Sequence, residues 1–459
     1  MSADSSAPTA VPFAQALRFW LCLGFISFGG PAGQIAIMHR ELVQEKRWIS
    51  ERRFLHALNY CMLLPGPEAQ QLATYLGWLM HRTWGGVLAG ALFVLPSLFI
   101  LIALSWLYMA FGHLPLVAAV LYGIKPAVAA IVLHAVWRIG SRTLKSPAQT
   151  PWLWAISVLS FLALAVLDIP FPWVVGAAAL AGWLGSRFAP AQFAPGGAGH
   201  GGAGGTTQSA LIDDNTPTPA HAVFGKARLA KVLMAGALLW LLPMAALLWT
   251  YGWGATLAHM GWFFSKAALL TFGGAYAVLP YVHQGAVEHF QWLSAAQMMD
   301  GLALGETTPG PLIMVVAFVG FVGGWTRQVL GPDAIFLGAA LAASVATWFT
   351  FLPSFIFILA GGPLVESTHG KLGFTAPLTA ITAAVVGVIA SLGLFFLGHV
   401  LFAGVVPRGL DSLAAIDGFA LALVLACFVA LVRFKRGVIS VIAAAAIAGC
   451  LHHLIARGV

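Results

Sequence analysis

Long apolar runs separated by short polar loops follow one another along almost the whole chain. Most of them approach the roughly 20 residues that an α-helix needs to cross a bilayer. The pattern predicts helical segments at 13–38, 54–80, 85–111, 114–137, 152–167, 171–186, 229–250, 263–282, 298–324, 334–360, 374–402, 418–432 and 437–455. An all-α polytopic membrane protein is therefore expected, in which Gly-Gly and Pro-Gly-Pro sequences leave some helices broken or re-entrant.

These breaks reveal an internal duplication. A spacing of 244 residues relates Phe28-Gly29-Gly30 to Phe272-Gly273-Gly274. The same spacing relates Trp48-Ile49-Ser50 to Trp292-Leu293-Ser294, and Pro65-Gly66-Pro67 to Pro309-Gly310-Pro311. Further on, a spacing of 257 relates Leu95-Pro96-Ser97 to Leu352-Pro353-Ser354, which predicts a loop insertion in 325–333. We interpret the chain as two copies of one unit.

The duplication divides the chain into five parts. They are a disordered tail at 1–12, a first copy at 13–186, a linker at 187–228, an unpaired helix at 229–250 and a second copy at 251–459. The linker is rich in Gly, Ala and Pro and too polar to cross a bilayer. The tail lacks the positive stretch of a signal peptide.

The unpaired helix predicts that the two copies have opposite orientations in the membrane. Six segments return the chain to its starting side, so one additional span starts the second copy from the other side. Loop charges agree, because Arg40, Lys46 and Arg47 mark the first-copy loop as cytoplasmic, whereas the equivalent loop 283–291 has no Lys or Arg. This arrangement requires that the Pro-Gly-Pro segments enter the membrane and return to the same side. It also places Arg408 and Arg457 on the outer side of the membrane. We predict an inverted-topology repeat.

Composition supports the membrane class and excludes others. Hydrophobic residues make up 60% of the chain and charged residues 8%, far from a soluble domain. The net charge of +8 comes from short loops, so it indicates orientation in a membrane rather than nucleic-acid binding. The four cysteines are scattered through apolar segments, and no GxxxxGK sequence is present. We expect no enzyme activity, no metal and no cofactor.

The broken segments form the candidate substrate site. Paired breaks in an inverted repeat are typical of secondary transporters, in which helix ends meet near the midplane. Free N–H groups at a helix start favour an anion, and glycine permits its close approach. The alternative is that these Gly and Pro residues only kink helices or allow tight packing.

Polar residues near the breaks are the next candidates. Ionisable groups at bilayer depth are costly and usually have a function or a partner. Glu306 is a candidate carrier of a coupling proton or a structural partner, and Thr307 and Thr308 are candidate hydroxyl donors. Lys125 suits a divalent anion, unless it extends to the interface. Further candidates for coupling or gating are Glu68, Gln34, Arg40 and Lys266, of which Arg40 and Lys266 could simply lie at the headgroups.

The paired Phe-Gly-Gly and Pro-Gly-Pro elements, each followed by Leu-Pro-Ser, resemble the chromate ion transporter (ChrA-type) family in its long, two-domain form. The resemblance covers almost the whole chain. It implies efflux of chromate across a bacterial inner membrane, driven by the membrane potential or a proton gradient, and chromate resistance. Its signature falls on Phe28, Gly29, Gly30, Pro31, Pro65, Gly66, Pro67, Phe272, Gly273, Gly274, Pro309, Gly310 and Pro311.

The two copies differ at the motif, which predicts one shared site with unequal contributions. Pro31 is replaced by Ala275 and Gln34 by Val278, while Met62-Leu63-Leu64 stands opposite Glu306-Thr307-Thr308. Expected partners are chromate or sulfate, protons as coupling ion, and the lipid bilayer, with a homodimer as one form of assembly. A sulfate carrier and a passive anion channel stay open as alternatives to a chromate exporter.

Overall fold

The computed structural model describes residues 11–28, 30–193, 210–213, 216–217, 219–272, 274–368, 375–402 and 416–456. Within these ranges every named element is a helix, and an isolated bridge joins Ile49 to Ile212. Six helices are long and apolar enough to cross a membrane. The prediction of an all-α polytopic membrane protein is confirmed. The tail 1–10, Gly29, Gly273, Arg408 and Arg457 lie outside the described residues.

The first copy and the second copy form the same series of elements. The first contains α1 Phe13–Ile26, α2 Gly30–His39, η1 Arg40–Glu45, α3 Glu51–Leu63, α4 Glu68–Phe111, α5 Pro115–Thr143, α6 Pro151–Ala165, α7 Phe171–Phe188 and α8 Pro190–Phe193. After α9 Lys226–Tyr251, the second contains α10 Thr256–Leu270, η2 Ala275–Val278, α11 Leu279–His283, η3 Gln284–His289, α12 Ala295–Thr307, η4 Leu312–Met314, α13 Val315–Thr326, η5 Pro332–Ala334, α14 Ile335–Thr368, α15 Thr375–Leu401, α16 Gly418–Val432 and α17 Val438–Ala456.

Local geometry repeats at equivalent positions of the two copies. Both η1 and η3 are π-helical, and each is followed by a residue with positive φ, Arg47 at 52° and Gln291 at 50°. Ser50 and Ser294 then cap α3 and α12 by accepting a hydrogen bond from a backbone N–H three residues later. The spacing that repeats within the sequence therefore corresponds to a local structure that also repeats.

Each Pro-Gly-Pro sequence is the tip of a helical hairpin. Tyr60 on α3 and Tyr75 on α4 lie on the two arms of the first hairpin, with ring centroids 5.9 Å apart. In the second hairpin, a Cβ on Gly301 of α12 would meet the ring of Phe318 on α13 at 2.3 Å. Since α3 and α12 have 13 residues each, both arms reach only ~20 Å, less than the ~30 Å hydrocarbon core.

A sharp bend divides α4 into a hairpin arm and a membrane span. His81 and Arg82 have non-helical backbone angles, and Gly77 before the bend lies against Gly85 after it. In the second copy, the separate helices α13 and α14 correspond to these two parts, and the predicted loop insertion lies between them. The chain thus returns from each tip and then crosses the molecule.

The two copies have their hairpin openings at opposite ends of two long helices. We call the region where α1 and α3 begin the first-copy end, and the region where α10 and α12 begin the second-copy end. At the first-copy end, the His81 imidazole contacts the Val11 carbonyl, and Arg53 lies 3.5 Å from Glu366, near the end of α14. α14 has 34 residues, ~50 Å, and it begins at the second-copy end.

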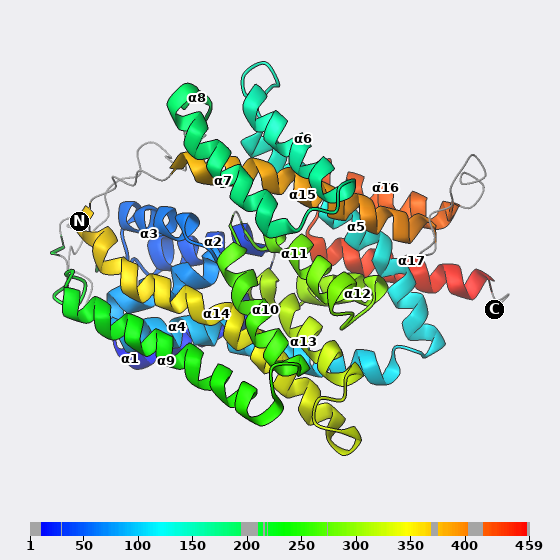
Figure 1. Cartoon of the computed structure of the whole chain (residues 1–459), viewed down its shortest axis with the longest axis horizontal. Helices are drawn as coiled ribbons and strands as arrows, with labels where there is room; N and C mark the ends of the chain where they lie inside the picture. Colours follow the sequence, from blue (N-terminus) through cyan, green and yellow to red (C-terminus); the bar gives the residue numbers. More distant parts are fainter. Residues whose placement is uncertain are drawn as a thin grey trace, which may run out of the picture.

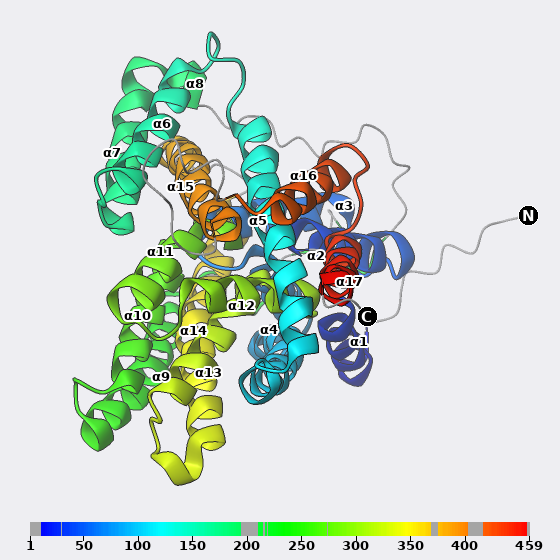
Figure 2. The same ribbon diagram turned by 90° about the vertical axis from the view of Figure 1, so that its right-hand side faces the viewer.

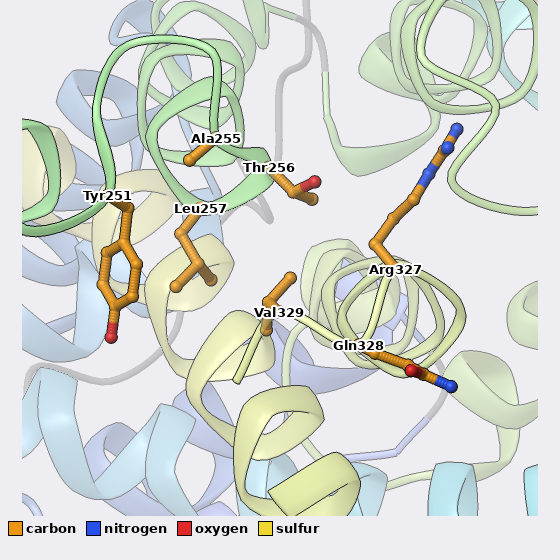
Figure 3. Close-up of a pocket in the computed structure, with 7 residues that line it drawn as sticks. All are labelled: Tyr251, Ala255, Thr256, Leu257, Arg327, Gln328 and Val329. Carbon is orange, nitrogen blue, oxygen red and sulfur yellow. The ribbon is translucent and has the colours of Figure 1, made fainter. Parts of the chain in front are cut away.

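A surface pocket of about 200 Å³ marks the second-copy end (Figure 3). It is lined by Tyr251 at the end of α9, Thr256 at the start of α10 and Arg327 after α13. The Arg327 guanidinium also donates to the Phe290 carbonyl at 3.0 Å. Because His221, just before α9, contacts the Trp78 carbonyl at the first-copy end, α9 also runs between the two ends.

The remaining long helices form a second layer in which the copies exchange partners. Helix α5 of the first copy packs on α16 and α17, and α15 of the second copy packs on α6 and α7 (Figures 1 and 2). Small residues permit the close approach, as at Gly123 of α5 against Gly449 of α17. The other layer contains α1, α4, α9, α10, α13 and α14, so neither copy is a separate globule.

Replacing Gly310 by alanine should destabilise the hairpin tip of the second copy. Gly310 has a φ of +105°, and an added Cβ would lie 2.8 Å from Cβ of Ser97. Strain of this kind costs about 1–3 kcal/mol. We expect a lower melting temperature of the detergent-solubilised protein, measured by fluorescence-detected size exclusion after heating. Gly225→Ala is the matched control, because Gly225 has a φ of −152° and open space around it. Equal melting temperatures would contradict the prediction.

Candidate functional site

The two copies are joined by a reciprocal pair of backbone hydrogen bonds at their breaks. The Gly66 N–H donates to the Thr271 carbonyl at 2.8 Å, and the Gly310 N–H donates to the Ser27 carbonyl at 2.8 Å. Ser27 and Thr271 are the residues at which α1 and α10 end. Each hairpin tip is therefore bonded to the broken helix of the other copy.

We call the bonded pairs Gly66–Thr271 and Gly310–Ser27 the two crossings. The two Leu-Pro-Ser motifs pack against these crossings. A Cβ on Gly66 would lie 2.3 Å from Oγ of Ser354, and a Cβ on Gly310 would lie 2.9 Å from Oγ of Ser97. Each motif serine thus faces the hairpin tip of the other copy, and only glycine fits between. The Pro-Gly-Pro and Leu-Pro-Ser motifs thus meet the residue that precedes each Phe-Gly-Gly motif.

Two glycines after the breaks face open space. Gly30 and Gly274 have φ values of +70° and +98°, and a Cβ on either would have no atom within 4 Å. Glycine is needed there for its backbone conformation, whereas the space in front of it is free. The neighbouring Gly29 and Gly273 lie outside the described residues.

A charged cluster lies beside the break of the second copy. The Tyr276 hydroxyl, two residues after Gly274, donates to the buried Glu306 carboxylate. The Arg138 guanidinium lies over the Tyr276 ring, 5.7 Å from its centroid. Arg138 also interacts electrostatically with Glu306 and with Glu68, which follows the Pro-Gly-Pro tip of the first copy. We call these four residues the Arg138 cluster.

The sequence analysis did not include Arg138 among the site residues. The predicted span ended at residue 137, whereas α5 continues to Thr143, so Arg138 lies on a helix instead of in a loop. Its side chain is half-buried. The available signal was its position directly after an apolar run, which is also where orientation charges occur.

The proposed hydroxyl and backbone donors are already engaged. The Thr307 hydroxyl donates to the carbonyls of Ala303 and Leu304, and the Thr308 hydroxyl donates to the Leu304 carbonyl. Because a hydroxyl has one hydrogen, neither has a further donor to offer. The N–H groups of Gly66 and Gly310 form the crossings. The four prolines Pro65, Pro67, Pro309 and Pro311 have no N–H.

Several buried side-chain oxygens around the first-copy break have no hydrogen-bond partner within the protein. The Gln34 amide donates to the Gly310 carbonyl at 2.5 Å and to the Ser27 carbonyl at 3.3 Å, which leaves its Oε1 unpaired. Oγ of Ser27 is likewise buried and unpaired, and so are Oε1 of Gln70 and of Gln71 on α4, after the Pro-Gly-Pro tip of the first copy. The side chains Ser27 and Gln34 at the Ser27–Gly310 bond are thus polar and uncharged.

Lys125 lies elsewhere along α5, paired with an acid. Its Nζ is 3.9 Å from Oδ2 of Asp300 on α12. Arg138 is thirteen residues further on, a separation of ~20 Å along a helix. In this conformation Lys125 is therefore not part of the Arg138 cluster.

Arg40 and Lys266 lie outside both groups. Arg40 is exposed on η1 and pairs with Glu41 and Glu45. The hydrogen bond from Lys46, with a smaller contribution from Arg40, lowers the pKa of Glu41 in that loop. Lys266 is exposed on α10 and lies over the Trp262 ring at 5.8 Å. The interfacial alternative describes both residues better than a role at the breaks.

In the part of the chain that the structure describes, no three His, Cys, Asp or Glu side chains lie close enough together to hold a metal ion. The Arg138 cluster has one cation and two carboxylates, and the space in front of Gly274 lies beside it. The site is therefore suited to a small charged ligand that competes with carboxylates for a guanidinium.

Comparison with known proteins identifies the family. The family described as "Chromate transporter" matches residues 14–183 and 258–450. The chain belongs to the chromate transporter family. The two matched regions correspond to the two copies and exclude the linker and α9.

Curated relatives from this family match along most of their length. A "Chromate transport protein" of Pseudomonas aeruginosa is 33% identical over 387 residues, 84% of this chain and 81% of the relative. A "Chromate transport protein" of Cupriavidus metallidurans is 30% identical over 376 residues, 82% of this chain and 80% of the relative. A "Probable chromate transport protein" of Synechococcus elongatus is 28% identical over 83% of this chain and 84% of the relative. No solved structure matches.

In this chromate transporter family member, replacing Gln34 by methionine should weaken the crossing at Ser27 and Gly310. The substitution keeps the size of the side chain but removes the amide that bonds both carbonyls. A buried carbonyl left without its partner costs about 1–3 kcal/mol. We expect a lower melting temperature in detergent, whereas Gln44→Met in the exposed loop η1 should leave it unchanged. A Gln34→Met protein as stable as the control would contradict a structural role for this amide.

Proposed function

We propose that this protein is a secondary transporter that exports chromate, a tetrahedral divalent oxyanion. The anion binds at the crossing of Thr271 and Gly66, where the Arg138 guanidinium is its cationic partner. Membership of the chromate transporter family supports the substrate class. The observation that carries the site is that Arg138 lies over the ring of Tyr276, which bonds Glu306, and interacts electrostatically with Glu306 of one copy and Glu68 of the other.

The Arg138 cluster has the chemistry to recognise an oxyanion. A guanidinium presents several N–H donors in a plane and binds two oxygens of one anion at once. Open space in front of Gly274 provides room beside the Tyr276 ring. Free N–H groups in the first turn of α2, after Gly30, add positive potential from the first copy.

The two carboxylates act as a gate for the empty site. With Glu68 and Glu306 ionised, the Arg138 cluster already carries more negative than positive charge, and a dianion adds to the excess. The anion therefore binds only when these carboxylates are displaced from Arg138. Tyr276 can follow this change, because its hydroxyl is released when Glu306 moves away.

The hairpin tips have a different role from the one that their glycines suggested. Since the N–H groups of Gly66 and Gly310 bond the opposite copy, we assign the two Pro-Gly-Pro tips to holding the breaks together. The glycines that face the anion are then Gly30 and Gly274. Gln34 supports the tip of the second copy from the first.

The direction of transport follows from charge. Moving a dianion out of a negative interior gains about 5 kcal/mol per 100 mV, which supports a concentration ratio on the order of a thousand. Export across the inner membrane of a bacterium is thus favourable without ATP, and it would confer chromate resistance.

Opposite orientation of the two copies is part of the proposal. The hairpin openings lie at the two ends of α14 and α9, and both helices have the length of a membrane span. This arrangement supports an inverted repeat with the Arg53 end in the cytoplasm. Arg142 in the last turn of α5, Lys145 after it and Lys226 at the start of α9 agree with this orientation.

Transport in proteoliposomes tests the function and the role of Arg138. A positive-inside potential set with potassium and valinomycin should drive uptake of radiolabelled chromate by the wild-type protein. Arg138→Gln should lose at least about 3 kcal/mol of anion binding, roughly a hundredfold or more, because it removes a charge-assisted pair from a buried site. Arg187→Gln is the control, since Arg187 is exposed over the Trp183 ring. Absence of uptake with a correctly folded wild-type protein would refute the proposal.

The same vesicles separate the alternatives. An excess of sulfate that suppresses chromate uptake would indicate a general oxyanion carrier. Chromate trapped inside should accelerate uptake of labelled chromate by a transporter, because the loaded carrier returns faster than the empty one. A passive channel shows no such acceleration.

Cysteine labelling tests the topology. In a version without Cys22, Cys61, Cys427 and Cys450, a single cysteine in 44–50 and one in 285–291 should react with an impermeant maleimide from opposite faces. The first should be reached from the cytoplasm and the second from outside. Labelling from one face would overturn the inverted repeat.

A further inference from the structure

Asp300 is a buried acid to which no role has been assigned. It lies on α12, six residues before Glu306, and its side chain is 3% exposed. The Tyr108 hydroxyl at the end of α4 donates to Oδ2 at 2.9 Å, and Lys125 Nζ of α5 lies 3.9 Å from the same oxygen. Three helices therefore meet at this carboxyl group.

One oxygen of Asp300 is left without any partner. Oδ1 is fully buried and accepts no hydrogen bond from any residue that the structure describes. A buried carboxylate normally has both oxygens satisfied, because an unpaired charged oxygen is costly in low dielectric. The ligand that best fits one free carboxylate oxygen in a closed space is a proton.

Other ligands fit this position less well. An anion would be repelled by the carboxylate. A multidentate metal site would need further ligating side chains, and no group of three His, Cys, Asp or Glu is found among the described residues. Lys125 is the cation beside Asp300, and at 31% side-chain exposure it connects the buried acid with a more accessible region.

We infer that Asp300 is the binding site of a coupling proton, with Lys125 as its charge partner, and that this site is distinct from the anion site at Arg138. The inference rests on the proposed function. Proton binding forms one O–H bond at Oδ1, with the proton supplied by water, and release reverses it. No other bond forms or breaks.

The geometry links this proton to the anion. When Asp300 is ionised, the ion pair with Lys125 holds α5 against α12; when it is neutral, the pair is lost. The same two helices carry Arg138 and Glu306, so a change in the attachment of α5 to α12 alters the Arg138 cluster. By linkage, the anion must then change the affinity for the proton by the same factor.

Few other titratable groups face Asp300. Lys125 comes from α5 and Tyr108 from α4, while α13 and η4 contain no titratable side chain. α17, which also packs on α12, carries His452 and His453 near its end, and His452 stacks on Phe419. α15 carries His399, which lies against Phe395 instead.

The decisive experiment measures chromate affinity against pH in the purified full-length protein. If one proton is linked, the affinity of the wild type should change by up to about tenfold per pH unit. Asp300→Asn is permanently neutral at this position, so its affinity for chromate should no longer change with pH in this way. Comparing the two proteins at each pH cancels the protonation of chromate itself. In proteoliposomes, the variant should also lose the response of chromate uptake to an imposed pH gradient.

Matched variants make the outcome decisive. Asp333→Asn at an exposed position should behave as the wild type, and Asp300→Glu should retain the pH dependence. An Asp300→Asn protein with the pH dependence of the wild type would overturn the inference. So would a result in which Glu306→Gln, rather than Asp300→Asn, removes it.

Failure of the inference is distinguishable from failure of the proposed function. A wild type that transports chromate without any response to a pH gradient would overturn the coupling site and leave the exporter intact. A wild type that binds and transports no chromate would refute both. Melting temperatures of all variants show whether a lost response reflects lost folding.

Discussion

The constraint on which the structure depends is that backbone polar groups inside a bilayer must be satisfied by the protein itself. Four broken segments leave such groups open at mid-depth. The two crossings solve the problem reciprocally, because the tip glycine of each copy donates to the last carbonyl of the broken helix in the other. Each break therefore receives a backbone donor from the other copy.

A symmetric scaffold of this kind does not impose symmetric chemistry. The crossings, the capping serines and the motif serines Ser97 and Ser354 occur twice. In the first copy, Ala32 and Met62 occupy the positions equivalent to Tyr276 and Glu306. The acid and its hydrogen-bond donor therefore occur only in the second copy. Gln34, in turn, has Val278 opposite it. The side chains beside the two crossings therefore differ, although the backbone hydrogen bonds repeat.

The sequence alone was informative where a residue type restricts the backbone. Gly and Pro predicted the breaks and the re-entrant tips, because few other residues permit those conformations. It was less informative where function depends on contacts between distant segments. The tip glycine Gly66 looked like an anion donor until its partner Thr271, more than 200 residues away, was known. Arg138 looked like an orientation charge because the predicted helix ended at residue 137, whereas α5 continues to Thr143. Lys125 looked unpaired because nothing near it in sequence indicates Asp300.

Helix α5 connects these observations. It carries Lys125, which pairs with Asp300, and Arg138, which interacts electrostatically with Glu306. It also packs on α16 and α17 in the second layer. Pro126 lies between the two cations and removes one hydrogen bond of the helix, which is a natural place for bending. A helix that can bend at Pro126 can keep Lys125 against Asp300 while Arg138 changes its distance from Glu306. The cations on α5 and the acids on α12 therefore link the hairpin of the second copy to the layer that contains α5. The strength of this link depends on the charge of these groups.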